Sequence, residues 1–183
     1  MLILEIQPFE YYDEKNQEFV EVKKATKLVL EHSLVSISKW EMKYKKAYLS
    51  DRPMNEEEVL YYIKCMTISQ NIDDSVYLGL SKDDIIKIKN YIEDDMTAVK
   101  FPDGISGQRQ ARRETYTSEL IYYLMTANNI PVEFQKWHLN RLLTLLKVCA
   151  VKNTPPKRRS KSQLTKDYAA INRANRAKFH TKG

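Results

Sequence analysis

The sequence predicts an α+β protein in which small N-terminal antiparallel strands pack on a mainly helical core, followed by one hairpin and a basic C-terminal helical arm. Three observations support this prediction. Apolar residues alternate with polar ones over the first thirty residues, as they do in strands. From Ser33 onward they recur every three or four residues, as they do on one face of a helix. Beyond Pro155-Pro156 the balance of charge changes sign.

The N-terminal strands are expected at residues 2–6, 18–22 and 26–31. Leu2, Leu4 and Ile6 alternate with their neighbours, and Pro8 stops the run. Polar residues separate the three segments and could form turns. The first thirty residues are therefore interpreted as a small β meander.

Helix starts are marked by residues that cap the first turn. The caps are Ser33, Asn55 with Glu58, Ser81 with Asp84, and Thr117 or Ser118. The segment from Pro131 to Val151 is the longest apolar stretch and is expected to be the central core helix, because its apolar stripe is broad. We expect Trp40 and Trp137 to be structural, with Trp137 in the core and His138 as a hydrogen-bonded core residue.

The one predicted hairpin is expected between the helices. Residues 96–101 and 112–117 favour extended structure, and Pro102-Asp103-Gly104 favours a turn. The sequence therefore predicts a hairpin with a mobile tip around residues 104–110.

Charge divides the chain into a globular domain, residues 1–151, and a basic arm, residues 152–183. The arm holds ten Lys or Arg residues and one acid, Asp167, which gives a net charge of +9. Because the whole chain has a net charge of +6, the domain carries −3. This asymmetry indicates an arm that meets a polyanionic or acidic partner.

Patterns that carry enzyme chemistry are weak in this sequence. Ser36 and Lys39 match a short serine–lysine motif, but the partner motifs of that chemistry are missing. No His has a second ligand at zinc-binding spacing, and no glycine-rich phosphate loop occurs. Paired acids such as Asp73-Asp74 and Asp94-Asp95 fit caps and solvated turns better than acid–base chemistry. We assign no catalytic, cofactor-binding or metal-binding residues and expect a protein without enzymatic activity.

The arm is the candidate partner-binding element. Its residues Leu164, Tyr168 and Ile171 recur at helical spacing beside charged residues, which suits docking of a helix in a groove on an acidic protein. Nonspecific contact with nucleic acid ranks second, and an inert solubility tail ranks third. The predicted partner-binding residues are Lys157, Arg158, Arg159, Leu164, Tyr168, Ile171, Arg173 and Arg176.

Several composite segments resemble a group of small phage proteins described as tail assembly chaperones. The segments are Leu30–Ser36, Tyr62–Thr67, Glu119–Met125, Asn129–Pro131, Gln135–Leu145 and Pro155–Lys157, so the likeness spans most of the chain. This sequence departs from the group at residues 102–113, where it carries an extended, charged hairpin tip.

The resemblance implies a protein of the host cell cytoplasm that binds the phage tape measure protein, or other phage structural proteins, while the tail tube polymerises. Self-association and nonspecific nucleic-acid contact through the arm remain open, and no membrane partner is expected. The alternative is a structural virion protein of the neck, tail or capsid, whose basic arm contacts DNA or a neighbouring subunit.

Overall fold

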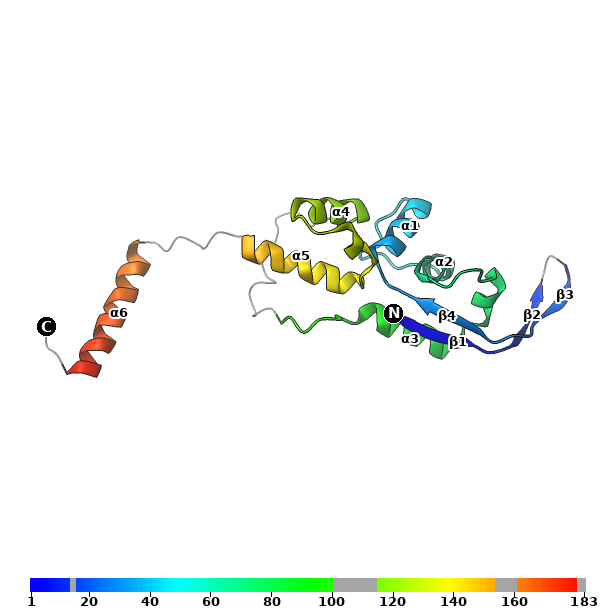
Figure 1. Cartoon of the computed structure of the whole chain (residues 1–183), viewed down its shortest axis with the longest axis horizontal. Helices are drawn as coiled ribbons and strands as arrows, with labels where there is room; N and C mark the ends of the chain where they lie inside the picture. The colour runs from blue at the N-terminus through cyan, green and yellow to red at the C-terminus, as the bar shows by residue number, and fades with distance from the viewer. Residues whose placement is uncertain (14–15, 101–114, 154–160, 181–183) are drawn as a thin grey trace. The chain divides into compact units, whose positions relative to one another are not determined.

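The computed structural model describes residues 1–13, 16–100, 115–153 and 161–180 (Figure 1). The chain divides into two compact units, Met1–Cys149 and Ala150–Gly183, and we call the first of them the body. The strands are β1 (Leu2–Ile6), β2 (Phe9–Asp13), β3 (Glu18–Val22) and β4 (Thr26–Leu30). The α-helices are α1 (Leu34–Tyr44), α2 (Glu56–Met66), α3 (Lys82–Glu93), α4 (Ser118–Ala127), α5 (Leu139–Asn153) and α6 (Lys161–Phe179), and the 3-10 helices are η1 (Asp74–Gly79) and η2 (Val132–Lys136). The predicted α+β fold class is confirmed.

The predicted N-terminal meander is wrong, because the strands form two separate two-stranded antiparallel sheets, of which we call the β2–β3 pair the ribbon. β1 pairs with β4, and β2 pairs with β3 in a second two-stranded sheet. The prediction omits β2 because Pro8 interrupts the alternation of apolar residues, whereas in the structure Pro8 only separates β1 from β2. Phe9 then anchors the ribbon: its ring occupies the space beside Gly79, where an added Cβ would lie 2.3 Å from a ring carbon.

The β1–β4 pair supplies one wall of the core. Leu4 pairs with Leu28, and both side chains are buried on the inward face, as periodicity 2 requires. Pairing continues past β4: the Glu31 amide donates to the Met66 carbonyl at 2.9 Å, and the Leu139 amide donates to the His32 carbonyl at 2.7 Å. The segment after β4 is therefore held on both sides by elements distant in sequence.

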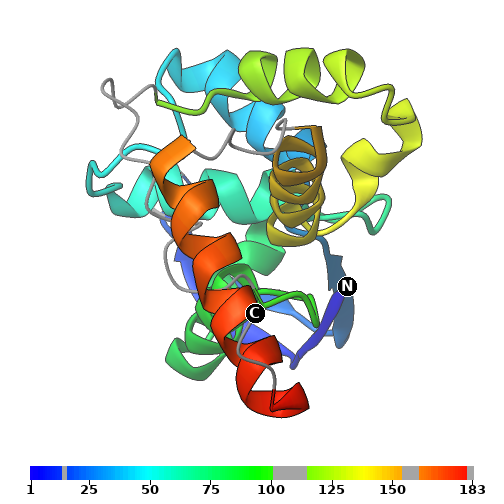
Figure 2. The ribbon, with the colours of Figure 1, turned by 90° about the vertical axis from the view of Figure 1, so that its left-hand side faces the viewer.

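The helices lie over this wall in layers. Figures 1 and 2 show α1 and α4 on one side of the body and β1 and β4 on the other, with α2 and α5 between them. The predicted caps are confirmed: Ser33, Asn55 and Ser81 each form a capping box, and Thr117 accepts from the Leu120 amide. These caps satisfy amide groups that the first helical turn leaves without partners.

The single core helix predicted from Pro131 to Val151 is wrong. The segment forms η2, an extended turn at Trp137, and then α5. The break occurs because Ser33 and His138 form a β-bridge, which requires extended backbone where the helix would have continued. The most buried helix is α1, with five buried residues against three in α5. The burial of His138 is confirmed, since it is 7 % exposed and its Nε2 lies 2.9 Å from the Tyr91 carbonyl oxygen.

The hairpin predicted between the helices is not present where the structure describes the chain. Residues 96–100 and 115–117 contain no strand, which corrects the prediction of extended pairing there. The turn at Pro102-Asp103-Gly104 and the tip at residues 104–110 lie outside the described residues.

The two tryptophans differ in burial, and fluorescence quenching can test the position of each. Trp40 is 1 % exposed and its indole N–H donates to the Glu58 carbonyl at 3.0 Å, whereas Trp137 is only half-buried, so its predicted core position is wrong. Arg141 lies 4.1 Å from the Trp137 ring, where its charge attracts an anion. We expect iodide to quench the wild-type fluorescence substantially and the Trp137→Phe variant little. Strong quenching of that variant, with neutral acrylamide as the control quencher, would contradict the buried position of Trp40.

Candidate functional site

Five of the eight predicted partner-binding residues lie on α6. They are Leu164, Tyr168, Ile171, Arg173 and Arg176. The other three, Lys157, Arg158 and Arg159, lie outside the described residues. The predicted helical arm is confirmed as a helix of 19 residues.

The helix α6 carries an apolar stripe, which we define as Leu164, Tyr168 and Ile171. At about 100° per residue the three side chains fall within a sector of about 60°. They are 38 %, 63 % and 55 % exposed, respectively. Arg173 and Lys166 lie on the opposite side of the helix by the same geometry. An exposed helix with one apolar and one cationic side is suited to bind an acidic surface that also offers apolar contacts.

The ribbon formed by β2 and β3 carries exposed groups that the sequence analysis missed. The register places Glu10 opposite Glu21 and Tyr12 opposite Phe19, so these four side chains share one face. The Tyr12 and Phe19 rings meet edge to face with centroids 5.2 Å apart. The alternation in Phe9-Glu10-Tyr11-Tyr12-Asp13 indicates this strand in the sequence, but it follows Pro8, at which the strand prediction ends.

A buried polar cluster lies where β4, α1, α2 and the start of α5 meet. Nδ1 of His32 lies 2.5 Å from the Tyr62 hydroxyl, which lies 3.3 Å from Oγ of Ser36. The His32 and His138 rings meet edge to face with centroids 5.1 Å apart. Burial, and secondarily the charge of His138, lower the pKa of His32 to about 3, and burial raises the pKa of Tyr62 well above its ordinary value. Both groups are therefore uncharged at neutral pH, which suits a structural polar cluster.

Ser36 and Lys39 do not form a nucleophile and base. The Ser36 hydroxyl is buried and accepts from the Ser33 amide at 3.0 Å, as part of the capping box of α1. The same hydroxyl donates to the Ser33 carbonyl at 2.7 Å. Lys39 is exposed. A lysine that acts as a base must reach the hydroxyl it deprotonates, and these two side chains occupy different environments.

Buried carboxylates join the loop segments to the helices. Glu58 is 1 % exposed, and its oxygens accept from Arg52 at 2.7 and 2.8 Å and from Lys46 at 3.1 Å. The hydrogen bond from Arg52 is the largest cause that lowers the pKa of Glu58, to about 2. Glu41 accepts from the Tyr48 amide and, across the body, from the Ser118 amide, each at 2.8 Å. All of these oxygens accept bonds that hold the backbone or a side chain in place, so their arrangement is structural.

A shallow pocket of about 380 Å³ lies between the end of β3 and the start of η1. Glu21, Lys23 and Asp73 line it together with backbone and apolar groups. Asp73 caps η1 by accepting from the Ser75 amide at 2.8 Å. The pocket offers charges of both signs and no cluster of converging polar groups.

Within residues 1–13, 16–100, 115–153 and 161–180, no group of three or more His, Cys, Asp or Glu residues is placed to hold a metal ion. Nor does any helix in the described part of the chain combine the length and apolar character needed to cross a bilayer.

Comparisons with protein-family models, with curated proteins and with solved structures find no match for this chain.

Proposed function

We propose that this protein is a non-enzymatic tail assembly chaperone of a long-tailed bacteriophage, which binds the tape measure protein in the host cytoplasm during tail morphogenesis. The proposal is supported by the resemblance of its sequence to that group and by one structural observation. That observation is the exposed apolar stripe of α6 on a helix that carries a net positive charge.

The physical basis of the proposal is the need to cover apolar surface. A tape measure protein is a long, largely helical rod whose apolar faces are exposed until tube subunits surround it. Large exposed apolar patches lead to aggregation. Small subunits that each bind through one amphipathic helix would cover those faces and leave as tube subunits compete for them.

The runner-up function is a structural virion protein of the neck, tail or capsid. The cationic side of α6, with Lys166 and Arg173, favours it because the same charges could contact DNA phosphates or an acidic neighbour. Mass spectrometry of purified particles separates the two functions. A chaperone is absent or present in traces, whereas a structural subunit is stoichiometric.

Substitutions in the apolar stripe of α6 test the chaperone function. We define the stripe variant as Leu164→Ser with Ile171→Ser, and its matched control as Ala169→Ser with Ala177→Ser, which lie on the other side of α6. Loss of two apolar anchors is expected to weaken binding to tape measure fragments of the same phage at least tenfold, which is about 1.4 kcal/mol. The control should bind like the wild type, because it lowers helix propensity without removing the stripe. Isothermal titration calorimetry measures both.

The salt dependence of binding distinguishes contact with DNA, expected of the virion protein, from contact with a protein through the stripe. Binding to duplex DNA should weaken with salt at a slope of about −0.9 per neutralised phosphate, whereas binding to a protein through the stripe should change little. If the stripe variant binds tape measure fragments as tightly as the control does, the chaperone proposal fails. Tight, steeply salt-dependent DNA binding in that case would favour the virion protein.

A further inference from the structure

The β2–β3 ribbon has one sheet face that is exposed in the described part of the chain; we call it the hairpin face and define it as Glu10, Tyr12, Phe19 and Glu21. Tyr12 is 50 % exposed and Phe19 is 75 % exposed, although the two rings contact each other. The ribbon projects from the body beyond η1 (Figure 1). Single exposed apolar side chains are common, but two contacting aromatic rings on a projecting ribbon form a ready contact surface.

The charges on this face indicate what kind of partner it would bind. Glu10 and Glu21 lie directly opposite each other, and like charges in that position are destabilising. Lys23 reaches Glu21 at 3.6 Å but is itself largely exposed. A cationic partner with apolar side chains would relieve the repulsion and cover the rings. A two-stranded sheet is only marginally stable alone, so such a partner would also stabilise the ribbon.

The helix α6 of this protein has the matching chemistry. The hairpin face carries two acids, Glu10 and Glu21, and strands β2 and β3 contain no Lys or Arg; Asp13 and Glu18 of the same strands lie on the opposite face. The helix α6 carries five Lys or Arg residues and one acid, a charge of +4. Its apolar stripe includes Tyr168, and Phe179 adds a further exposed ring. Complementary charge accelerates encounter and selects the partner, while the apolar contacts provide affinity.

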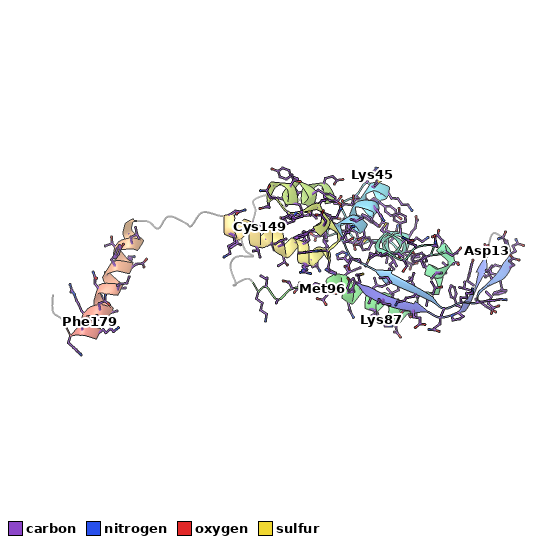
Figure 3. The ribbon with its side chains drawn as sticks, in the orientation of Figure 1. Asp13, Lys45, Lys87, Met96, Cys149 and Phe179 are labelled. Carbon is purple, nitrogen blue, oxygen red and sulfur yellow. The ribbon has the colours of Figure 1, made fainter. Side chains whose placement is uncertain are left out.

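We propose that the hairpin face binds α6 of a second copy of this chain. Within the body, Cys149 at the end of α5 and Asp13 at the tip of the ribbon lie at opposite ends (Figure 3). The arm follows Cys149 in sequence, so pairing with a neighbouring copy does not require the arm to fold back along its own body. This is a heterologous contact, since the two copies use different surfaces, and it links copies head to tail in open chains or in closed rings. The inference goes beyond the proposed function and does not depend on it.

The contact has to be weak. A strand of five residues is about 17 Å long, and the hairpin face offers four side chains, well below the roughly 800 Å² per partner of a stable interface. Under the proposed function the tape measure protein binds the same stripe, and one stripe cannot bind two partners at once. Head-to-tail chains would therefore come apart as the tape measure protein binds.

Complementation between two variants tests the inference. The hairpin variant is Tyr12→Ser with Phe19→Ser, and the stripe variant is defined above. In sedimentation velocity across a range of concentrations, wild-type chains should grow beyond the dimer. Each variant alone should stay monomeric at concentrations where the wild type associates, because its apparent affinity for self-association is at least tenfold weaker. An equimolar mixture should form dimers and stop there, because one intact hairpin face and one intact stripe remain available to each other. A control variant, Ile86→Ser with Tyr123→Ser, removes exposed apolar side chains elsewhere on the body and should associate like the wild type.

A second variant of the hairpin face separates loss of binding from unfolding of the ribbon. Glu10→Gln with Glu21→Gln keeps the shape and removes the opposed charges, so it should leave the fold intact, weaken association and reduce its dependence on salt. Several outcomes overturn the inference: a wild type that stays monomeric, a hairpin variant that associates as the wild type does, or a mixture that shows no dimer. Tape measure binding by the hairpin variant is a separate measurement, so failure here leaves the chaperone proposal to its own test.

Discussion

Replacement of Leu142 with alanine is expected to lower the free energy of unfolding by about 2–5 kcal/mol. Leu142 lies on α5 with no exposed surface and belongs to the same buried cluster as residues of α1 and α4. Removing its side chain beyond Cβ loses the favourable burial of those carbons and leaves a cavity that a packed core fills only in part. Urea denaturation, followed by far-ultraviolet circular dichroism, measures the change.

The matched control is Leu78→Ala in η1, because Leu78 is 58 % exposed. Most of that side chain is already in water, so the change in the free energy of unfolding should stay within about 0.5 kcal/mol. A loss below about 0.5 kcal/mol for Leu142→Ala would contradict its place in the core. It would also remove α5 from the elements that stabilise the body.

Features that depend on neighbouring residues could be predicted from the sequence. The caps at Ser33, Asn55 and Ser81 act within one helical turn, so the residues three positions later complete the pattern. The helix α6 and its stripe are likewise a local pattern, and the structure places Leu164, Tyr168 and Ile171 on one exposed side. Their predicted role in binding a partner stays a prediction.

Features that depend on distant residues could not be predicted. The helix expected from Pro131 breaks because the His32 carbonyl, far away in sequence, accepts from the Leu139 amide and holds His138 extended. The strand β2 forms because β3 pairs with it and because Gly79 leaves room for the ring of Phe9. The hairpin face follows from that pairing register, since a shift by one residue would move Tyr12 and Phe19 to opposite faces.

Lowering the pH from 7 to 5 is expected to destabilise the body by about 2 kcal/mol through His32 alone. Burial, with the charge of His138, lowers the folded-state pKa of His32 to about 3, whereas the unfolded chain has the ordinary value of 6.5. Between those two values the unfolded chain binds a proton that the folded chain does not, so stability falls as the pH falls. Each unit below 6.5 costs about 1.4 kcal/mol. The pKa of Glu58 is lowered from 4.5 to about 2, so the stability that its charged carboxylate contributes is lost only below about pH 4.5.

The change His32→Asn isolates this effect because Asn places a polar atom near the position of Nδ1, beside the Tyr62 hydroxyl, and does not titrate. We expect urea denaturation of this variant to lose most of the pH dependence between 7 and 5, while His180→Asn, at the exposed end of α6, keeps it. Nuclear magnetic resonance of the wild-type imidazoles provides a measurement that needs no variant. A His32 ring that becomes charged in the folded protein near pH 6, or an unchanged pH dependence in His32→Asn, would show that the buried cluster does not hold this histidine neutral.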